Sequence, residues 1–229
     1  MIDPITMAHV GAALAATALV GMFLRGRVAA CWSFFAYLLV GVAANRLVVH
    51  FPERFFEFTF WSSKETVLHV LKILVAVEIW HRTFSSFPRA RVRVGLALAG
   101  GLLAIAVAVR TLPTDLLLYD TLVGVLFPRQ QAGVLMLFAV VVSAIGWHRV
   151  PLHPHHRAIL VGFGACLPLS TFIASFIGFQ SSELWQLRLR PFEQLAFVAA
   201  SDWWAWTAWR PRVAPSPIVS RLQPWAHSW

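Results

Sequence analysis

The fold is decided by residues 5–49, which read ITMAHVGAALAATALVGMFL, then RGR, then VAACWSFFAYLLVGVAANRLVV. Two apolar runs of twenty or more residues flank a short basic turn that holds Arg25 and Arg27. A bilayer core of about 30 Å is crossed by about 20 helical residues, because each adds about 1.5 Å. Each run therefore predicts one membrane-spanning helix, and the basic turn predicts a loop at the membrane surface.

The composition extends this prediction to the rest of the chain. Of the 229 residues, 59% are hydrophobic and only 13% are charged, and the mean hydropathy is +0.69. A soluble domain usually carries about a quarter charged residues, so a cytosolic enzyme, a secreted disulfide scaffold and a disordered chain are disfavoured. The net charge of +9 does not indicate binding to nucleic acid, because the bases lie mostly in short segments between apolar runs.

Seven apolar segments follow one another along the sequence. They cover residues 5–24, 28–49, 66–84, 94–109, 115–147, 158–179 and 192–209. The fifth is too long for one untilted span, so its first half either lies partly outside the hydrocarbon or kinks at Pro128. The sequence thus predicts an all-α membrane protein, with a bundle of seven transmembrane helices over residues 1–209. Residues 210–229 form a Pro/Trp-rich tail, interpreted either as an interfacial anchor or as a disordered segment.

The distribution of basic residues predicts the orientation. With the N-terminus outside, eleven of the 19 Lys and Arg residues fall in inner segments and five fall in outer ones. Cytoplasmic loops carry the excess of Lys and Arg, so we expect the N-terminus outside and the C-terminus in the cytoplasm. Four tryptophans near the predicted inner boundary agree with this orientation, namely Trp32, Trp80, Trp147 and Trp209.

Charged side chains in the outer half of the spans form the first candidate site. Arg46, His69, Lys72 and Arg129 lie at similar predicted depth, and charges within a span are costly enough to suggest a function. They predict an outward-facing cavity with a basic floor, suited to an anionic or amphiphilic ligand. The alternative is a set of structural ion pairs between helices, which would balance the bases without any ligand.

Two carboxylates in the inner half form the second candidate site. Glu78 and Asp202 lie at similar predicted depth on the third and seventh spans. One interpretation is a proton or cation relay. The other is that each carboxylate only accepts hydrogen bonds from neighbouring side chains.

A group of histidines lies at the inner junction of the fifth and sixth spans. His148, His153, His155 and His156 are weak candidates for transition-metal ligands or for a pH sensor, and a solvated loop is the alternative. No catalytic residues and no metal site are indicated by a motif. No cofactor is indicated either, and pigment, lipid and haem are left open.

The segment around the third span carries a spaced set of residues. They are Trp61, Glu65, Glu78, Phe84, Phe87, Pro88 and Arg91. In this pattern, and in the order of its later spans, the chain resembles a family of bacterial seven-span inner-membrane proteins. The resemblance implies a seven-helix fold in a bacterial inner membrane. That family has no assigned activity, so the resemblance supplies no substrate, cofactor or catalytic residue.

With so little of the chain outside the spans, the sequence predicts a non-catalytic integral membrane protein. The first interpretation is an accessory subunit of a larger membrane complex, or a sensor that acts through a partner. Ala97 and Gly101 in the fourth span have the spacing of close helix packing. The alternative is a transporter or ligand-binding protein that uses the outward-facing basic cavity. The expected partners are membrane lipids and other membrane protein subunits.

Overall fold

The computed structural model describes residues 4–55, 57–110, 126–180 and 183–211, and within these ranges it contains helices and no strands. The long helices are α1 (Pro4–Leu24), α2 (Trp32–His50), α4 (Phe58–Thr83), α5 (Pro88–Arg110), α7 (Phe127–His148), α8 (Pro154–Gln180) and α9 (Glu183–Trp209). Two short helices join them, η1 (Val28–Ala30) before α2 and α3 (Pro52–Phe55) after it. The predicted all-α class is confirmed for the described chain.

Five of these helices are long and apolar enough to cross a membrane: α1, α2, α5, α7 and α8. The remaining two long helices, α4 and α9, have 26 and 27 residues and a more polar composition. In α4 part of this polarity is turned inward, because His69 and Lys72 are buried. The described chain is therefore a helical, membrane-like protein with several apolar helices.

Some helix boundaries differ from the predicted ones. The third span was expected from residue 66, whereas α4 begins at Phe58 and includes the polar turn around Lys64 and Glu65. Pro128 lies in the first turn of α7, where a proline needs no amide donor and the helix does not kink. The first part of the long fifth segment, residues 115–125, and the tail from residue 212 lie outside the described residues.

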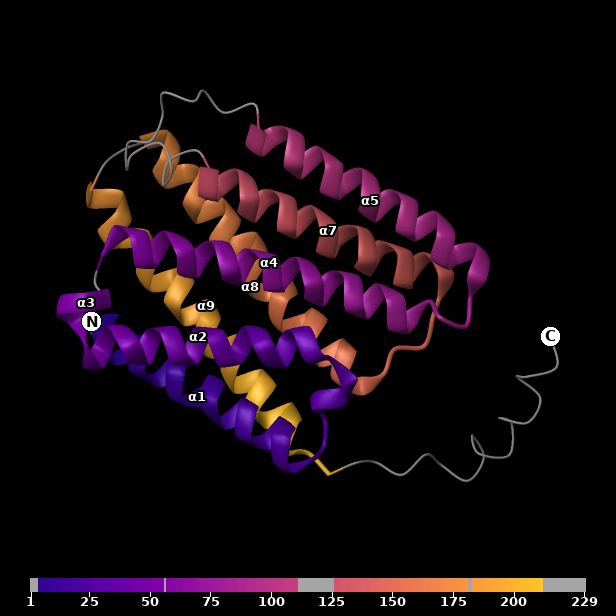
Figure 1. Ribbon diagram of the computed structural model, residues 1–229, viewed down its shortest axis with the longest axis horizontal. Helices are drawn as coiled ribbons and strands as arrows, with labels where there is room; N and C mark the ends of the chain where they lie inside the picture. The colour runs from indigo at the N-terminus through magenta and orange to yellow at the C-terminus, as the bar shows by residue number, and fades with distance from the viewer. Residues whose placement is uncertain (1–3, 56, 111–125, 181–182, 212–229) are drawn as a thin grey trace.

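The long helices form a closed ring with one helix outside it. Around the ring the neighbours are α1, α2, α4, α7, α8 and α9, and α9 packs again on α1. The helix α5 packs on the outer side of α7 and, more lightly, on α4 (Figure 1). The start of α1 and the end of α9 lie at opposite ends of the bundle (Figure 1).

A cluster of aromatic rings fills the middle of the ring. Phe34 and Tyr37 of α2 meet Phe163 of α8 and Trp204 of α9, with ring centroids 5.0–6.5 Å apart. Gly162 lies directly beneath the Trp204 indole, so a side chain on Gly162 would collide with it. The aromatic cluster packs α2, α8 and α9 together near the end of the bundle at which α2 begins and α9 ends.

The basic turn after α1 also has a structural role. The guanidinium of Arg27 donates hydrogen bonds to the backbone carbonyls of Thr207 and Arg210 at the end of α9. These carbonyls lack partners within the helix and carry the negative end of its dipole, so a cation stabilises them. An arginine that indicates orientation in the sequence thus joins the first and last long helices.

Candidate functional site

The half of the bundle in which α1 and α4 begin, the predicted outer half, contains a cavity of about 200 Å³. Its walls include the small residues Ala12 and Ala15 of α1 and Gly41 of α2, the ring of Phe197 on α9, and charged residues on α4. The small residues leave the space into which the α4 side chains extend. The cavity is thus built where α1, α2, α4 and α9 meet.

The charged residues that line the cavity lie on one face of α4, and Asn45 of α2 also lines it. Lys64 and Glu65 form an ion pair at 3.1 Å in the first half of the helix. Lys72, two turns further along, lines the same cavity and is 9% exposed. The charges of Glu65 and Glu193 act on the Lys72 ammonium through space, but no carboxylate of the described residues lies within 4.0 Å of it.

Neutral groups on α7 and α8 complete the surroundings of Lys72. Lys72 Nζ donates to Gln131 Oε1 at 3.4 Å, and His69 Nε2 lies 2.8 Å from the same oxygen. Gln131 Nε2 in turn donates to Ser170 Oγ, and His69 Nδ1 donates to the Glu65 carbonyl at 2.7 Å. The side-chain amide of Gln131 therefore links α4 to α7 and α8, and it gives Lys72 a neutral hydrogen-bond partner.

The structure brings together two of the four predicted basic residues. Lys72 and His69 are buried side by side, whereas Arg46 is exposed on α2 and Arg129 is exposed in the first turn of α7. Sequence reasoning missed Gln131 and Ser170, which are buried polar residues within apolar runs. Their position within apolar runs of the sequence is the signal that could have identified them, because an uncharged polar group in a span also needs a partner.

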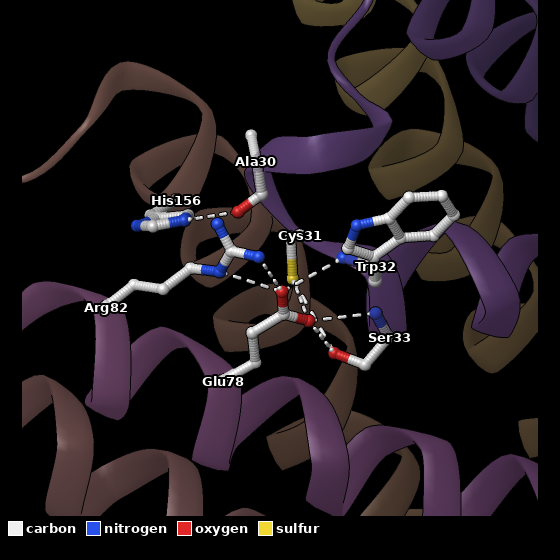
Figure 2. A network of polar contacts seen from close by, with 7 residues as sticks. All are labelled: Ala30, Cys31, Trp32, Ser33, Glu78, Arg82 and His156. Carbon is white, nitrogen blue, oxygen red and sulfur yellow. Dashed lines mark hydrogen bonds and ion pairs between the residues drawn. The ribbon is translucent and has the colours of Figure 1, made fainter.

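At the other end of α4, Glu78 accepts hydrogen bonds from the start of α2 (Figure 2). Its carboxylate receives the backbone N–H groups of Trp32 and Ser33 at 3.1 and 2.9 Å and the Ser33 hydroxyl at 2.6 Å. The first N–H groups of a helix have no partner within it, and the helix dipole favours an anion there. Glu78 thus caps α2 from a neighbouring helix.

The remaining contacts of Glu78 neutralise its charge. Arg82, one turn later on α4, places Nε and Nη2 each 2.8 Å from Oε1 of the carboxylate (Figure 2). The Cys31 thiol donates to Oε2 at 3.5 Å. Burial, with the charge of Glu78 beside it, raises the pKa of the Cys31 thiol from 9.0 to about 12, so Cys31 stays protonated and is not a nucleophile.

The second predicted carboxylate lies elsewhere. Asp202 is exposed on α9, and none of the groups that bind Glu78 comes from that helix. The two residues that were predicted at similar depth therefore have different surroundings. For Glu78, the contacts are those of the hydrogen-bonding interpretation.

The four histidines divide into an exposed and a buried pair. His148 and His153 are exposed, while His155 and His156 are buried. His156 Nε2 donates to the Ala30 carbonyl at 2.9 Å, shown in Figure 2, and His153 Nδ1 accepts the backbone N–H of His155 at 3.3 Å. Across the described chain, no three His, Cys, Asp or Glu side chains converge as metal ligands.

No protein-family model, curated protein or solved structure matches the chain. The resemblance to a family of bacterial inner-membrane proteins therefore stays a prediction. The functional argument rests on the geometry of the two ends of α4.

Proposed function

We propose that this chain is a multi-pass protein of a bacterial inner membrane with seven spans, its N-terminus outside and its C-terminus in the cytoplasm. The five apolar helices support this proposal, because α4 and α9 pack among them in the same ring and have similar lengths. The bases that follow α1, α4, α7 and α9 all lie at one end of the bundle, which suits a cytoplasmic face.

Within this frame, we propose that the protein binds a small anion in the outer cavity, as a transporter or ligand-binding protein. The observation that carries the proposal is Lys72, a buried ammonium that lines the cavity without a carboxylate in contact. Burying a charge is costly unless it is paired. An anionic ligand would supply the missing pair.

The size of the cavity restricts the ligand. Pockets for drug-sized molecules have volumes of about 300–1,000 Å³, whereas this cavity has about 200 Å³. A small carboxylate or inorganic anion therefore fits better than a sugar or a long amphiphile. The aromatic cluster below Tyr37 closes the cavity toward the inner end, as expected of an outward-facing state.

The arrangement of the ring also favours binding between two halves of the bundle. Along the chain, α1, α2 and α4 precede α5, and α7, α8 and α9 follow it, and both sets of three begin at the same end (Figure 1). Transporters built from repeats bind substrates at the interface between them, near the middle of the membrane. Lys72 and His69 lie at such an interface, since their partner Gln131 belongs to the second group.

Thermal unfolding of the purified full-length chain in detergent tests this proposal. Sodium acetate, nitrate and phosphate are titrated separately at constant ionic strength, and at least one should raise the melting temperature saturably. A ligand at 100 times its Kd adds about 2.7 kcal/mol to stability. Lys72→Met should abolish the effect, and the exposed base variant Arg46→Met should keep it. The proposal fails if no anion stabilises the wild type or if Arg46→Met loses the effect equally.

One observation favours a second candidate, the accessory subunit. Asp202 lies on a face of α9 that also exposes Leu195, Trp206 and Trp209. It is seven residues before the end of α9, so about 10 Å from that end, and a carboxylate facing lipid there costs about 3 kcal/mol. A base on a neighbouring membrane subunit would compensate it.

The exposed face of α5 suits the same role. Gly101 packs inward against Leu137, whereas a side chain added at Gly100 would meet nothing, and Ala97 is exposed beside it. Such small residues allow close approach of another helix. Purification from native membranes in mild detergent should then recover a partner in fixed stoichiometry, and recovery of the chain alone would count against this candidate.

A further inference from the structure

A second and larger hollow lies at the inner end of the bundle, between α2, α4 and the start of α8. Its volume is about 1140 Å³. The wall farther from the end of α4 is apolar and consists of Ala36 of α2 and Leu71, Leu74 and Val77 of α4. Leu74 is 46% exposed, so this wall faces outward from the bundle. We call this hollow the inner groove.

The lower end of the inner groove is polar. It is lined by His81 and Arg82 at the end of α4 and by His153 and His156 before and within the first turn of α8. From Leu71 to Arg82 the groove follows α4 for about 16 Å. Apolar side chains thus line one end of the groove, and nitrogen donors line the other.

The polar end of the groove carries one ion pair. Among the described residues, Glu78 is the acid that lines the groove, and its two oxygens already accept bonds from Trp32, Ser33 and Arg82. The Arg82 guanidinium contacts Glu78 through Nε and Nη2, which leaves Nη1 for another acceptor. His81 and His153 are exposed side chains that line the same space.

Arginines around the groove give this end of the bundle a positive electrostatic potential. Nine arginines of the described chain lie at this end of the bundle, namely Arg25, Arg27, Arg82, Arg89, Arg91, Arg93, Arg149, Arg157 and Arg210. Among the described acids, Glu78 and Asp202 lie nearest this end, five and seven residues before the ends of α4 and α9. An anion is therefore attracted to the polar end of the groove over a distance of about a Debye length.

We infer that the inner groove is a binding site for one phospholipid with an anionic headgroup. The phosphate would lie among His81, Arg82 and His153, and one acyl chain would lie along Leu71, Leu74 and Val77. A soluble anion would leave the apolar wall unused. A neutral amphiphile without a phosphate would supply no acceptor for the Arg82 Nη1 group. The groove shares no described lining residue with the outer cavity, and Lys72 does not line it, so this site does not depend on the proposed anion cavity.

Non-denaturing mass spectrometry of the detergent-purified full chain tests the inference. Phosphatidylglycerol and phosphatidylcholine with identical acyl chains are titrated in parallel, and we expect phosphatidylglycerol to bind about tenfold more tightly, because the choline cation offsets the phosphate charge that the surrounding arginines attract. Glycerol phosphate, which carries the same phosphate without acyl chains, should not displace the bound lipid. Equal binding of the two lipids, or efficient displacement by glycerol phosphate, would overturn the assignment.

One double variant and one control variant test the polar end of the groove. The double variant His81→Ala/His153→Ala should reduce binding of phosphatidylglycerol about tenfold, to the level of phosphatidylcholine. His148→Ala removes an exposed imidazole from the same end outside the groove and should have no effect. Arg82 is left unchanged because it holds Glu78.

The apolar wall is tested separately. Leu74→Trp fills the groove and should weaken the binding of both lipids, while Leu96→Trp adds the same bulk to an exposed position of α5 and should not. Lys72→Met should leave lipid binding unchanged, which distinguishes a failure here from a failure of the outer cavity. If the control variants lose as much binding as the groove variants, the lipid does not occupy this groove.

Discussion

Lys72 and Glu78 lie six residues apart on α4, and the protein surrounds them in opposite ways. Glu78 receives donors from two backbone amides, a hydroxyl, a thiol and a guanidinium. Lys72 has one neutral amide oxygen at 3.4 Å. A charge whose hydrogen bonds are all made within the chain stabilises the fold, whereas one with a neutral partner beside a cavity is available to a ligand. The contrast supports a structural role for Glu78 and makes Lys72 the charged residue of the proposed anion site.

The largest expected effect concerns Glu78. Glu78→Ala removes the cap of α2 and leaves Arg82 without its carboxylate, so it should lower the free energy of unfolding by about 3 kcal/mol. Ser33→Ala removes one hydroxyl donor and keeps the cap, and should cost about 1 kcal/mol. Unfolding in sodium dodecyl sulfate, followed by circular dichroism, measures both. A Glu78→Ala protein as stable as the wild type would end the structural interpretation of this residue.

A smaller effect of opposite sign is expected at Lys72. Lys72→Met keeps the length of the side chain and removes a buried charge that has no carboxylate in contact, so it should stabilise the ligand-free protein by about 1 kcal/mol. Arg46→Met removes an exposed base on α2 and should stay within about 0.5 kcal/mol of the wild type. The same unfolding assay applies, without added anions. If Lys72→Met is instead destabilising, Lys72 resembles Glu78 and the contrast between them disappears.

The smallest effect concerns Cys31, whose thiol reports on the charge of Glu78. Because its pKa is raised from 9.0 to about 12, the unfolded chain loses the thiol proton near pH 9 while the folded chain keeps it. The contribution of Cys31 to stability is therefore complete below about pH 9 and declines as the pH rises toward about 12.

Alkylation by a maleimide in a Cys166→Ser background measures this thiol alone, since the chain has two cysteines. At pH 9 the folded protein should react on the order of a hundredfold more slowly than the denatured protein. Equal rates for the two forms would show that Cys31 is neither buried nor next to a carboxylate.

The helices could largely be predicted from the sequence, because apolar runs of sufficient length have few alternatives in lipid. The start of α4 could not, since its first two turns hold Lys64 and Glu65 and do not read as apolar. Hydropathy identifies the length that crosses the membrane. It does not identify the polar extension that continues the same helix beyond it.

The site was predicted in part, and the limit is rotation about each helix axis. Depth along a span grouped Lys72 with His69, which are buried side by side, but it also grouped them with Arg46, which is exposed on α2. Depth likewise paired Glu78 with Asp202, which face different surroundings. The partners that decide each role, Gln131 and the start of α2, come from helices whose adjacency the sequence does not state.

The position of α5 outside the ring determines the direction in which α7 runs relative to α4. The helices α4 and α7 are neighbours and run the same way (Figure 1), and a chain can join two such helices only by first returning across the bundle. In this protein α5 makes that return and lines neither the outer cavity nor the inner groove. Without a return crossing, the second group of three helices would be inserted upside down, and Gln131 would face the wrong end of α4. The helix α5, which lines neither site, thus determines the direction of α7, and the position of Gln131 beside Lys72 depends on that direction.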